Sequence, residues 1–136
     1  MITTNVIINR PIEKVWDAFS NPLHIIHWNF ASPEWHCPAA KNDLQPGGLF
    51  SYTMAAKDGS MSFEFGGVYD RVELHKTITY TLGDGRKVQI TFLLTEHGVE
   101  IEQKFDPESI NPIEMQQAGW QSILNNFKEY TLRLEP

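Results

Sequence analysis

The sequence contains a single cysteine, Cys37, so the chain cannot form an internal disulfide. It has no apolar run near the roughly 20 residues that a membrane-spanning helix needs. Its first residues lack the basic start and the apolar stretch of a signal peptide, and we therefore expect a cytoplasmic protein. Basic residues are also few: 11 Lys and Arg stand against 17 Asp and Glu, which gives a formal net charge of −6. No nucleic acid is expected as a partner, because nucleic-acid-binding domains normally carry a basic patch.

Sequence signatures of cofactor binding are missing as well. The glycine pairs Gly47–Gly48 and Gly66–Gly67 lie in hairpin or strand contexts and do not join a strand to a helix, as a phosphate-binding loop does. No internal repeat, low-complexity stretch or linker is present. With 136 residues, the chain has the length of one ordinary domain, spanning 1–136, and no cofactor is expected.

Helical periodicity is found at the two ends of the chain. After a β-rich run at 4–8, apolar residues at helical spacing predict a helix over Pro11–Ser20, and a second short helix is expected over about Pro22–His27. Near the C-terminus, Trp120, Leu124 and Phe127 recur on one helical face. They predict the longest element of the chain, a helix over about Ile113–Leu132, with Ser109 or Asn111 as its cap.

Between these helices the hydrophobic period changes to two. Apolar residues alternate with threonine or charged residues, which is typical of antiparallel strands with one face on a core. Glycine-containing turns separate the runs and predict a meander of hairpins, and Gly66–Gly67 suggests a bulge or a bend inside a strand. The alternating runs are 50–54, 63–65, 78–82, 88–94 and 99–105.

The predicted fold class is therefore α+β: a curled antiparallel sheet of about six or seven strands around the long C-terminal helix, with two short helices after the first strand. One helix cannot easily fill a sheet that wide, so we expect a cavity between them. The inward strand positions are unusually aromatic. The predicted ligand-binding residues are Trp28, Phe30, Trp35, His36, Phe50, Tyr52, Phe63, Phe65, Tyr80, Met115 and Gly119.

Five short motifs, in order along nearly the whole chain, resemble those of the START-like (SRPBCC) superfamily. The first two are a strand, a proline and a helix containing Val15–Trp16, followed by a short helix ending in Trp28. The other three are similar to a branch related to the C-terminal domain of the activator of the heat-shock-protein-90 ATPase. They lie at 43–50, 67–72 and 119–124, and their patterns are D-x-x-x-G-G-x-F, G-x-Y-x-x-V and G-W-x-x-x-L.

This resemblance implies a helix-grip fold with a deep hydrophobic cavity. The leading hypothesis is a protein that binds a lipid or another apolar or aromatic small molecule, as a monomer or weak homodimer. One alternative is a cyclase- or hydrolase-type enzyme using the same cavity. The other is a chaperone co-factor-like interaction module, which predicts an exposed apolar patch.

Few residues suggest chemistry. His24 and His27 share a possible helix face, but their spacing matches no strong metal pattern, so no metal site is predicted. Cys37 has no evident base, which favours a small buried or half-buried thiol, and no catalytic residue is assigned. Glu34, His36 and Gln116 are the polar residues most suited to reach a ligand.

Overall fold

The structure is a computed structural model that describes residues 1–134, so the last two residues of the predicted domain lie outside it. Strand β1 (Ile2–Ile8) alternates strictly between buried and exposed side chains. Helix α1 (Ile12–Ser20) begins directly after Pro11 and buries Val15, Trp16 and Ala18. Helix α2 (Pro22–Ile25) is shorter than predicted, and the Asn21 side chain caps it by accepting a hydrogen bond from the Leu23 N–H at 3.0 Å.

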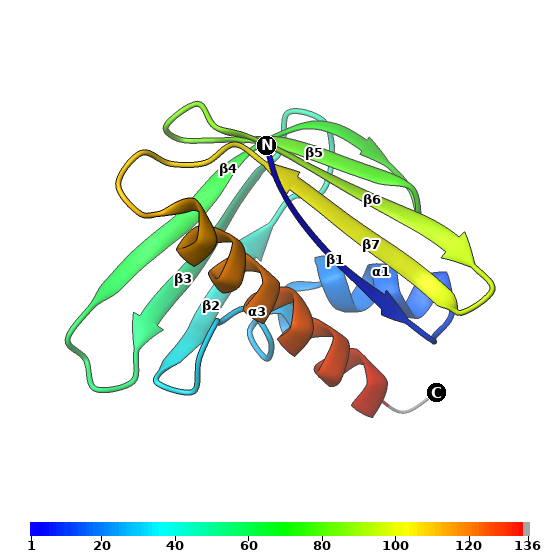
Figure 1. Cartoon of the computed structure of the whole chain (residues 1–136), viewed down its shortest axis with the longest axis horizontal. Coiled ribbons are helices and arrows are strands. Elements are labelled where there is room, and N and C mark those ends of the chain that lie inside the picture. The colour runs from blue at the N-terminus through cyan, green and yellow to red at the C-terminus, as the bar shows by residue number, and fades with distance from the viewer. Residues whose placement is uncertain (135–136) are drawn as a thin grey trace.

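The remaining strands form one antiparallel sheet with β1, which confirms the predicted α+β class and strand number. Strands β1 and β2 are the two edges, so α1 and α2 carry the chain from one edge of the sheet to the other (Figure 1). The spatial order is β1-β7-β6-β5-β4-β3-β2. The bounds are β2 (Trp35–Asn42), β3 (Leu49–Ala56), β4 (Ser62–Glu73), β5 (Thr77–Leu82), β6 (Lys87–Thr95) and β7 (Gly98–Phe105).

Helix α3 (Ile113–Arg133) crosses the concave side of the sheet and packs mainly against β1, with a further contact to α1 (Figure 1). Its Leu124 and Phe127 are almost fully buried. Phe127 meets the rings of Phe19 and Trp28, with centroids 5.2 and 4.8 Å away. The core is thus continuous between the helix, the short N-terminal helices and the sheet.

The glycine pair in β4 has a different role from the predicted bulge. Gly66 and Gly67 pair in register with β3, and Gly67 also pairs in register with Leu82 of β5. A Cβ atom at Gly67 would lie only 2.3 Å from the Thr81 carbonyl oxygen, so the pair permits a close approach of backbones. The register shift lies further along, between Tyr69 and Arg71. It turns Val72 as well as Tyr69 toward the core.

Two other expectations need correction. Neither Ser109 nor Asn111 caps α3: Pro112 occupies the cap position and no side chain caps it. The alternation along β6 places Leu94 on the inward face, but its side chain is 69% exposed, because the β6–β7 hairpin extends beyond the region that α3 covers.

The open edge of β1 is covered by side chains of α3. The Gln121 amide accepts a hydrogen bond from the Asn5 N–H at 3.2 Å and donates one to the Asn5 carbonyl at 2.9 Å. Gln117 donates to the Thr3 carbonyl at 3.1 Å. At the opposite edge, β2 contains Pro38 within an irregular stretch of pairing. Both devices disfavour edge-to-edge pairing of sheets.

None of the helices in residues 1–134 combines the length and the apolar character that crossing a lipid bilayer requires.

Candidate functional site: a cavity between the sheet and α3

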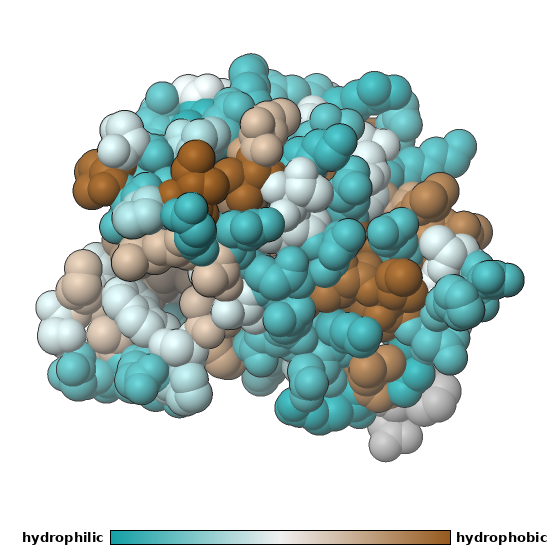
Figure 2. All heavy atoms as spheres, in the orientation of Figure 1, coloured by the Kyte–Doolittle hydropathy of each residue, from teal (hydrophilic) through white to brown (hydrophobic). Residues whose placement is uncertain are grey.

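A cavity of about 290 Å³ lies where α3 leaves the sheet uncovered. Its walls come mainly from β3, β4 and β5. The end of α1, the segment after α2, the end of β2 and the loop after it, the β5–β6 turn, β6, β7 and the middle of α3 supply the other lining residues. Figure 2 shows the surface hollowed between the first turns of α3 and strands β3 and β4. Phe63, which is 49% exposed, stands at this opening.

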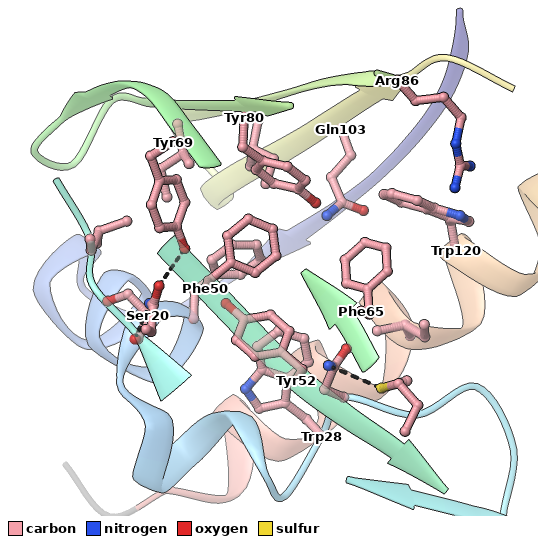
Figure 3. A pocket seen from close by; sticks show the side chains of 18 of the residues that line it. Ser20, Trp28, Phe50, Tyr52, Phe65, Tyr69, Tyr80, Arg86, Gln103 and Trp120 are labelled. Atoms are coloured by element: carbon pink, nitrogen blue, oxygen red, sulfur yellow. Dashed lines mark hydrogen bonds between the residues drawn. The ribbon is translucent and has the colours of Figure 1, made fainter. Parts of the chain in front are cut away.

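The sheet side of the cavity is a group of mutually packed aromatic rings around Phe50 (Figure 3). The ring centroid of Phe50 lies 5.2 Å from that of Tyr52, 5.0 Å from Tyr69 and 4.7 Å from Tyr80. These rings come from three different strands, and the β4 bulge leaves Tyr69 facing inward beside them. Each ring is held by its neighbours, so the wall is rigid and largely pre-formed.

The opposite side is built on two tryptophans. Trp120 of α3 stacks on Phe105 of β7, with ring centroids 3.9 Å apart and planes inclined by 11°. It also meets the edge of Phe65 across the cavity. Trp28 is fixed by donating its indole N–H to the Ala18 carbonyl at 2.9 Å. The cavity therefore offers flat apolar surfaces on both sides.

A chain of hydrogen bonds runs along one wall. Tyr52 contacts the hydroxyl of Tyr69, which donates to Asn42 Oδ1, and Asn42 donates in turn to the Ser20 carbonyl at 2.7 Å. Burial raises the pKa of Tyr69 to about 12, although its hydrogen bonds oppose the rise. Burial likewise raises the pKa of Tyr52 well above its ordinary value. Both phenols therefore stay protonated and neutral near pH 7.

Three further polar side chains line the cavity: Tyr80 and Gln103 lie near each other, and Arg86 lies beside Trp120 (Figure 3). Gln103 of β7 accepts a hydrogen bond from the Thr4 hydroxyl at 3.1 Å. Arg86 lies in the turn between β5 and β6, where Asp84 accepts from its Nε at 2.7 Å. Burial raises the pKa of Tyr80 well above its ordinary value, and the positive charge of Arg86 opposes this rise.

Six of the predicted ligand-binding residues lie on the cavity wall: Trp28, Phe50, Tyr52, Phe63, Phe65 and Tyr80. The other five do not. Trp35 packs against Phe63 from outside, with centroids 5.8 Å apart. His36 is half-buried on β2, and Met115 is 60% exposed on the first turn of α3.

Phe30 and Gly119 also lie away from the wall. Phe30 borders a separate surface depression beside α3. Gly119 has no heavy atom within 4 Å of the position where a Cβ would lie, so it is not a close helix–sheet contact. Gln116, considered a ligand contact, instead donates to the carbonyls of Glu108 and Asn111 and braces the loop before α3.

The polar residues of the wall are the main omission of the sequence analysis. Gln103 could have been found, because it occupies an inward position of β7 between Ile101 and Phe105, where the alternation calls for an apolar side chain. Arg86 gave no such signal, since a residue in a turn has no defined face. The inward direction of Asn42 also depends on the tertiary structure.

The remaining candidates are placed outside the cavity. His24 is 2.5 Å from the Tyr130 hydroxyl and 3.3 Å from Asp17, and His27 stacks on the same tyrosine ring. Within residues 1–134, no three side chains of His, Cys, Asp or Glu gather as a metal-binding group. Cys37 is 2% exposed, as predicted for a buried thiol, and burial raises its pKa.

The curled antiparallel sheet, the long C-terminal helix and the cavity between them define a helix-grip protein of the START-like superfamily. Within that class, the chain belongs to the family described as activator of Hsp90 ATPase homolog 1-like proteins, whose model matches residues 9–131. Both placements agree with the resemblance carried by the sequence motifs. A comparison with curated proteins gave no match.

Solved structures support the same placement. A protein of Aeromonas hydrophila described as AHSA1-like is 41% identical, with a TM-score of 0.91 over 96% of this chain and 91% of that one. A protein of Cytophaga hutchinsonii is 59% identical, with a TM-score of 0.84 over 96% and 90%. A protein of Nitrosomonas europaea shares the fold at 17% identity, with a TM-score of 0.82 over 97% and 94%.

Proposed function

We propose that this protein binds an apolar, ring-containing small molecule in the cavity between the sheet and α3. The observation that carries the proposal is the cavity itself: about 290 Å³, with many aromatic rings in its walls, of which Phe50, Tyr69 and Tyr80 pack on one another across three strands. This volume is near the lower end for ligand sites and suits a compact ligand rather than a long-chain lipid. Flat, rigid walls favour flat ligands, because few side chains must be ordered on binding.

Binding is proposed ahead of catalysis because of the protonation states of the wall. Within the described residues, the titratable groups lining the cavity are three tyrosines and Arg86. Burial raises the pKa of each tyrosine away from neutrality. A general base works best with a pKa near the working pH, so these phenols suit hydrogen bonding rather than proton abstraction.

The interaction-module alternative has one observation in its favour. Ile110, Ile113 and Met115 are exposed and close together in the chain, around the start of α3. The family description also refers to a chaperone activator. Exposed apolar residues alone do not specify a partner, whereas the cavity has defined walls and polar positions. The cavity is therefore the stronger basis for function.

The test uses N-phenyl-1-naphthylamine, a neutral probe whose fluorescence rises in apolar surroundings. We expect saturable binding to the wild-type protein. Ile123→Trp places a ring into the cavity from α3 and should weaken binding at least tenfold. Leu93→Trp adds the same ring on the outer face of β6, where Leu93 is 60% exposed, and should not change the affinity.

Two results would contradict the proposal. The probe could fail to bind to the wild-type protein, or it could bind equally well to both tryptophan variants. In the second case the probe would occupy a surface outside the cavity, and the interaction-module hypothesis would gain support.

A further inference from the structure

The polar side chains at the two positions of the cavity differ in whether they have hydrogen-bond partners within the protein. At one wall, the Tyr69 hydroxyl donates to Asn42, which donates in turn to the Ser20 carbonyl, and Tyr52 lies against Tyr69. At the other end, Tyr80 is 7% exposed and Gln103 is 9% exposed. No residue within 1–134 provides a hydrogen-bond partner for the Tyr80 hydroxyl or for the Gln103 amide nitrogen.

These two unpartnered groups face open cavity space. In residues 1–134, every side-chain polar atom that is fully shielded has a hydrogen-bond partner. Since the Tyr80 hydroxyl and the Gln103 amide nitrogen have none, they must reach the cavity volume. Figure 3 shows both pointing into the same region. Buried donors without partners are costly, so their presence together indicates a position that a ligand completes.

Arg86 adds a positive charge at this position. It is the one charged residue among the described residues that line the cavity. Asp84 accepts hydrogen bonds from the Arg86 Nε and backbone N–H, at 2.7 and 3.1 Å, and so fixes the side chain from behind. No hydrogen bond within residues 1–134 occupies the two terminal guanidinium nitrogens of Arg86. Figure 3 shows the guanidinium group beside the Trp120 indole.

Nearby carboxylates do not replace a ligand here. Asp84 contacts only the Nε side of the guanidinium group. Glu108, whose pKa is lowered mainly by its hydrogen bond from Asn111 and slightly by Arg86, is held by the backbone N–H groups of Asn111 and Ile110. The net charge of −6 acts from farther away, and salt screens exposed charges beyond about 10 Å.

We propose that the ligand is an apolar ring compound bearing a carboxylate, and that Arg86, Gln103 and Tyr80 bind this carboxylate. The three side chains supply hydrogen-bond donors of three kinds: a guanidinium fork, an amide N–H and a phenol O–H. A carboxylate accepts all three, and its two oxygens match the arginine fork. The rings of Trp120, Phe65 and Phe50 then contact the apolar body. This inference rests on the proposed binding function.

The test compares 2-naphthoic acid with 2-naphthamide by calorimetric titration at neutral pH. The two ligands have nearly the same shape, but only the acid is charged. We expect the wild-type protein to bind the acid at least tenfold more tightly. Arg86→Met keeps an unbranched side chain without the charge. It should lower the affinity for the acid by about ten- to a hundredfold and change the affinity for the amide less than about threefold.

The matched control is Lys87→Met, which changes the net charge equally at the next residue. Lys87 has a 63% exposed side chain and lies outside the cavity, so this variant should bind the acid as the wild type does. Tyr80→Phe keeps the ring and removes one donor. It should lower the affinity for the acid roughly three- to tenfold and leave the affinity for the amide nearly unchanged.

Three results would overturn the inference. They are equal wild-type affinity for acid and amide, equal loss of acid binding in Arg86→Met and Lys87→Met, or no binding of either compound. If N-phenyl-1-naphthylamine still binds and Ile123→Trp weakens its binding, only the inference that the ligand carries a carboxylate is contradicted, and the proposed binding function stands. If that probe also fails, the binding function itself is wrong.

Discussion

The inner face of the sheet is filled in two different ways. In the filled half, α3 packs against β1, and strands β1 and β7 carry almost fully buried aliphatic residues such as Ile8, Val99 and Ile101. In the cavity half, strands β3, β4 and β5 carry rings such as Phe50, Tyr69 and Tyr80, which surround open space. Both halves have the same inward alternation, so alternation alone does not distinguish a packed core from a binding site.

Two physical differences separate the halves. Helix α3 packs against β1 and so closes only that side of the curled sheet. Branched aliphatic side chains interdigitate and leave few voids. The rings of the cavity half brace one another instead, and three of them carry hydroxyls that are better placed beside polar groups than in a dry core. The comparison teaches that the identity of the inward residues indicates which part of a sheet is kept open.

The largest expected effect is a difference in stability between two phenylalanines. Phe127→Ala removes a fully buried ring between Phe19 and Trp28 and should lower the free energy of unfolding by about 3–5 kcal/mol. Phe65→Ala removes a half-buried ring from the cavity wall and should cost about 1–2 kcal/mol, because water already reaches that space. Urea unfolding of both variants measures the difference. Equal losses would mean that the two halves are packed alike.

Alkaline pH should weaken the cavity half. The pKa of Tyr69 is raised from 10 in the unfolded chain to about 12 in the folded protein. As the pH rises, the unfolded state therefore loses this proton before the folded state does. The contribution of Tyr69 to the free energy of unfolding is fully present below pH 10, and about 2–3 kcal/mol of it is lost as the pH rises to 12.

The matching variant is Tyr80→Phe, because the Tyr80 hydroxyl has no hydrogen bond to lose within the described residues. Burial also raises the folded-state pKa of Tyr80. The variant should therefore lose less stability than the wild type between pH 10 and 12, and its stability should equal that of the wild type near pH 7. Urea midpoints measured across this pH range give the comparison. A loss as steep as that of the wild type would show that Tyr80 is not shielded from water.

A smaller effect concerns the exposed edge of the filled half. Gln121→Leu removes both hydrogen bonds between α3 and Asn5 and should cost about 1 kcal/mol. Gln89→Leu makes the same change at an exposed position of β6 and should stay within about 0.5 kcal/mol of the wild type. Urea unfolding measures both. If the two variants lose the same stability, the glutamine contacts do not hold the edge.

The smallest effect is a gain in stability near the cavity half. Gly119→Ala should stabilise the protein by about 0.5–1 kcal/mol, because alanine is the better helix former and its Cβ meets no atom within 4 Å. Thermal unfolding would record a rise in Tm. Since Gly119 does not line the cavity, binding of N-phenyl-1-naphthylamine should not change. A loss of stability would indicate a contact at this position that the structure does not show.

Most of the fold could be predicted from the sequence, because periodicity is a local property. The helix over Ile113–Arg133 and the strands of the meander follow from alternation and turn residues, and the motif order gave the superfamily. Of the bulge or bend that the sequence suggests at Gly66–Gly67, the bulge lies elsewhere in β4: the glycines permit a close backbone approach, and the irregularity follows Tyr69. The exposure of Leu94 could not be predicted either, because it depends on how much of the sheet α3 covers.

The candidate site was predicted only in part. Phe50, Tyr52, Phe65 and Tyr80 were found because ring residues at inward strand positions can be recognised from the sequence. Met115 and Gly119 were chosen from their position on α3, and the helix directs Trp120 and Ile123 to the cavity instead. Errors of this kind are expected wherever a site joins elements distant in sequence, because a helix face is fixed only once the helix is packed.

By itself, the sequence determined an α+β domain with an aromatic inner face, because the spacing of apolar residues decides which side chains each element buries. Only the tertiary structure decided where the inner face stays open and which polar groups meet there. Arg86, Gln103 and Tyr80 come from a turn and from two strands that are not neighbours in the sheet. Their meeting depends on the curl of the sheet and on the path of α3, which are properties of the whole chain and not of any one segment.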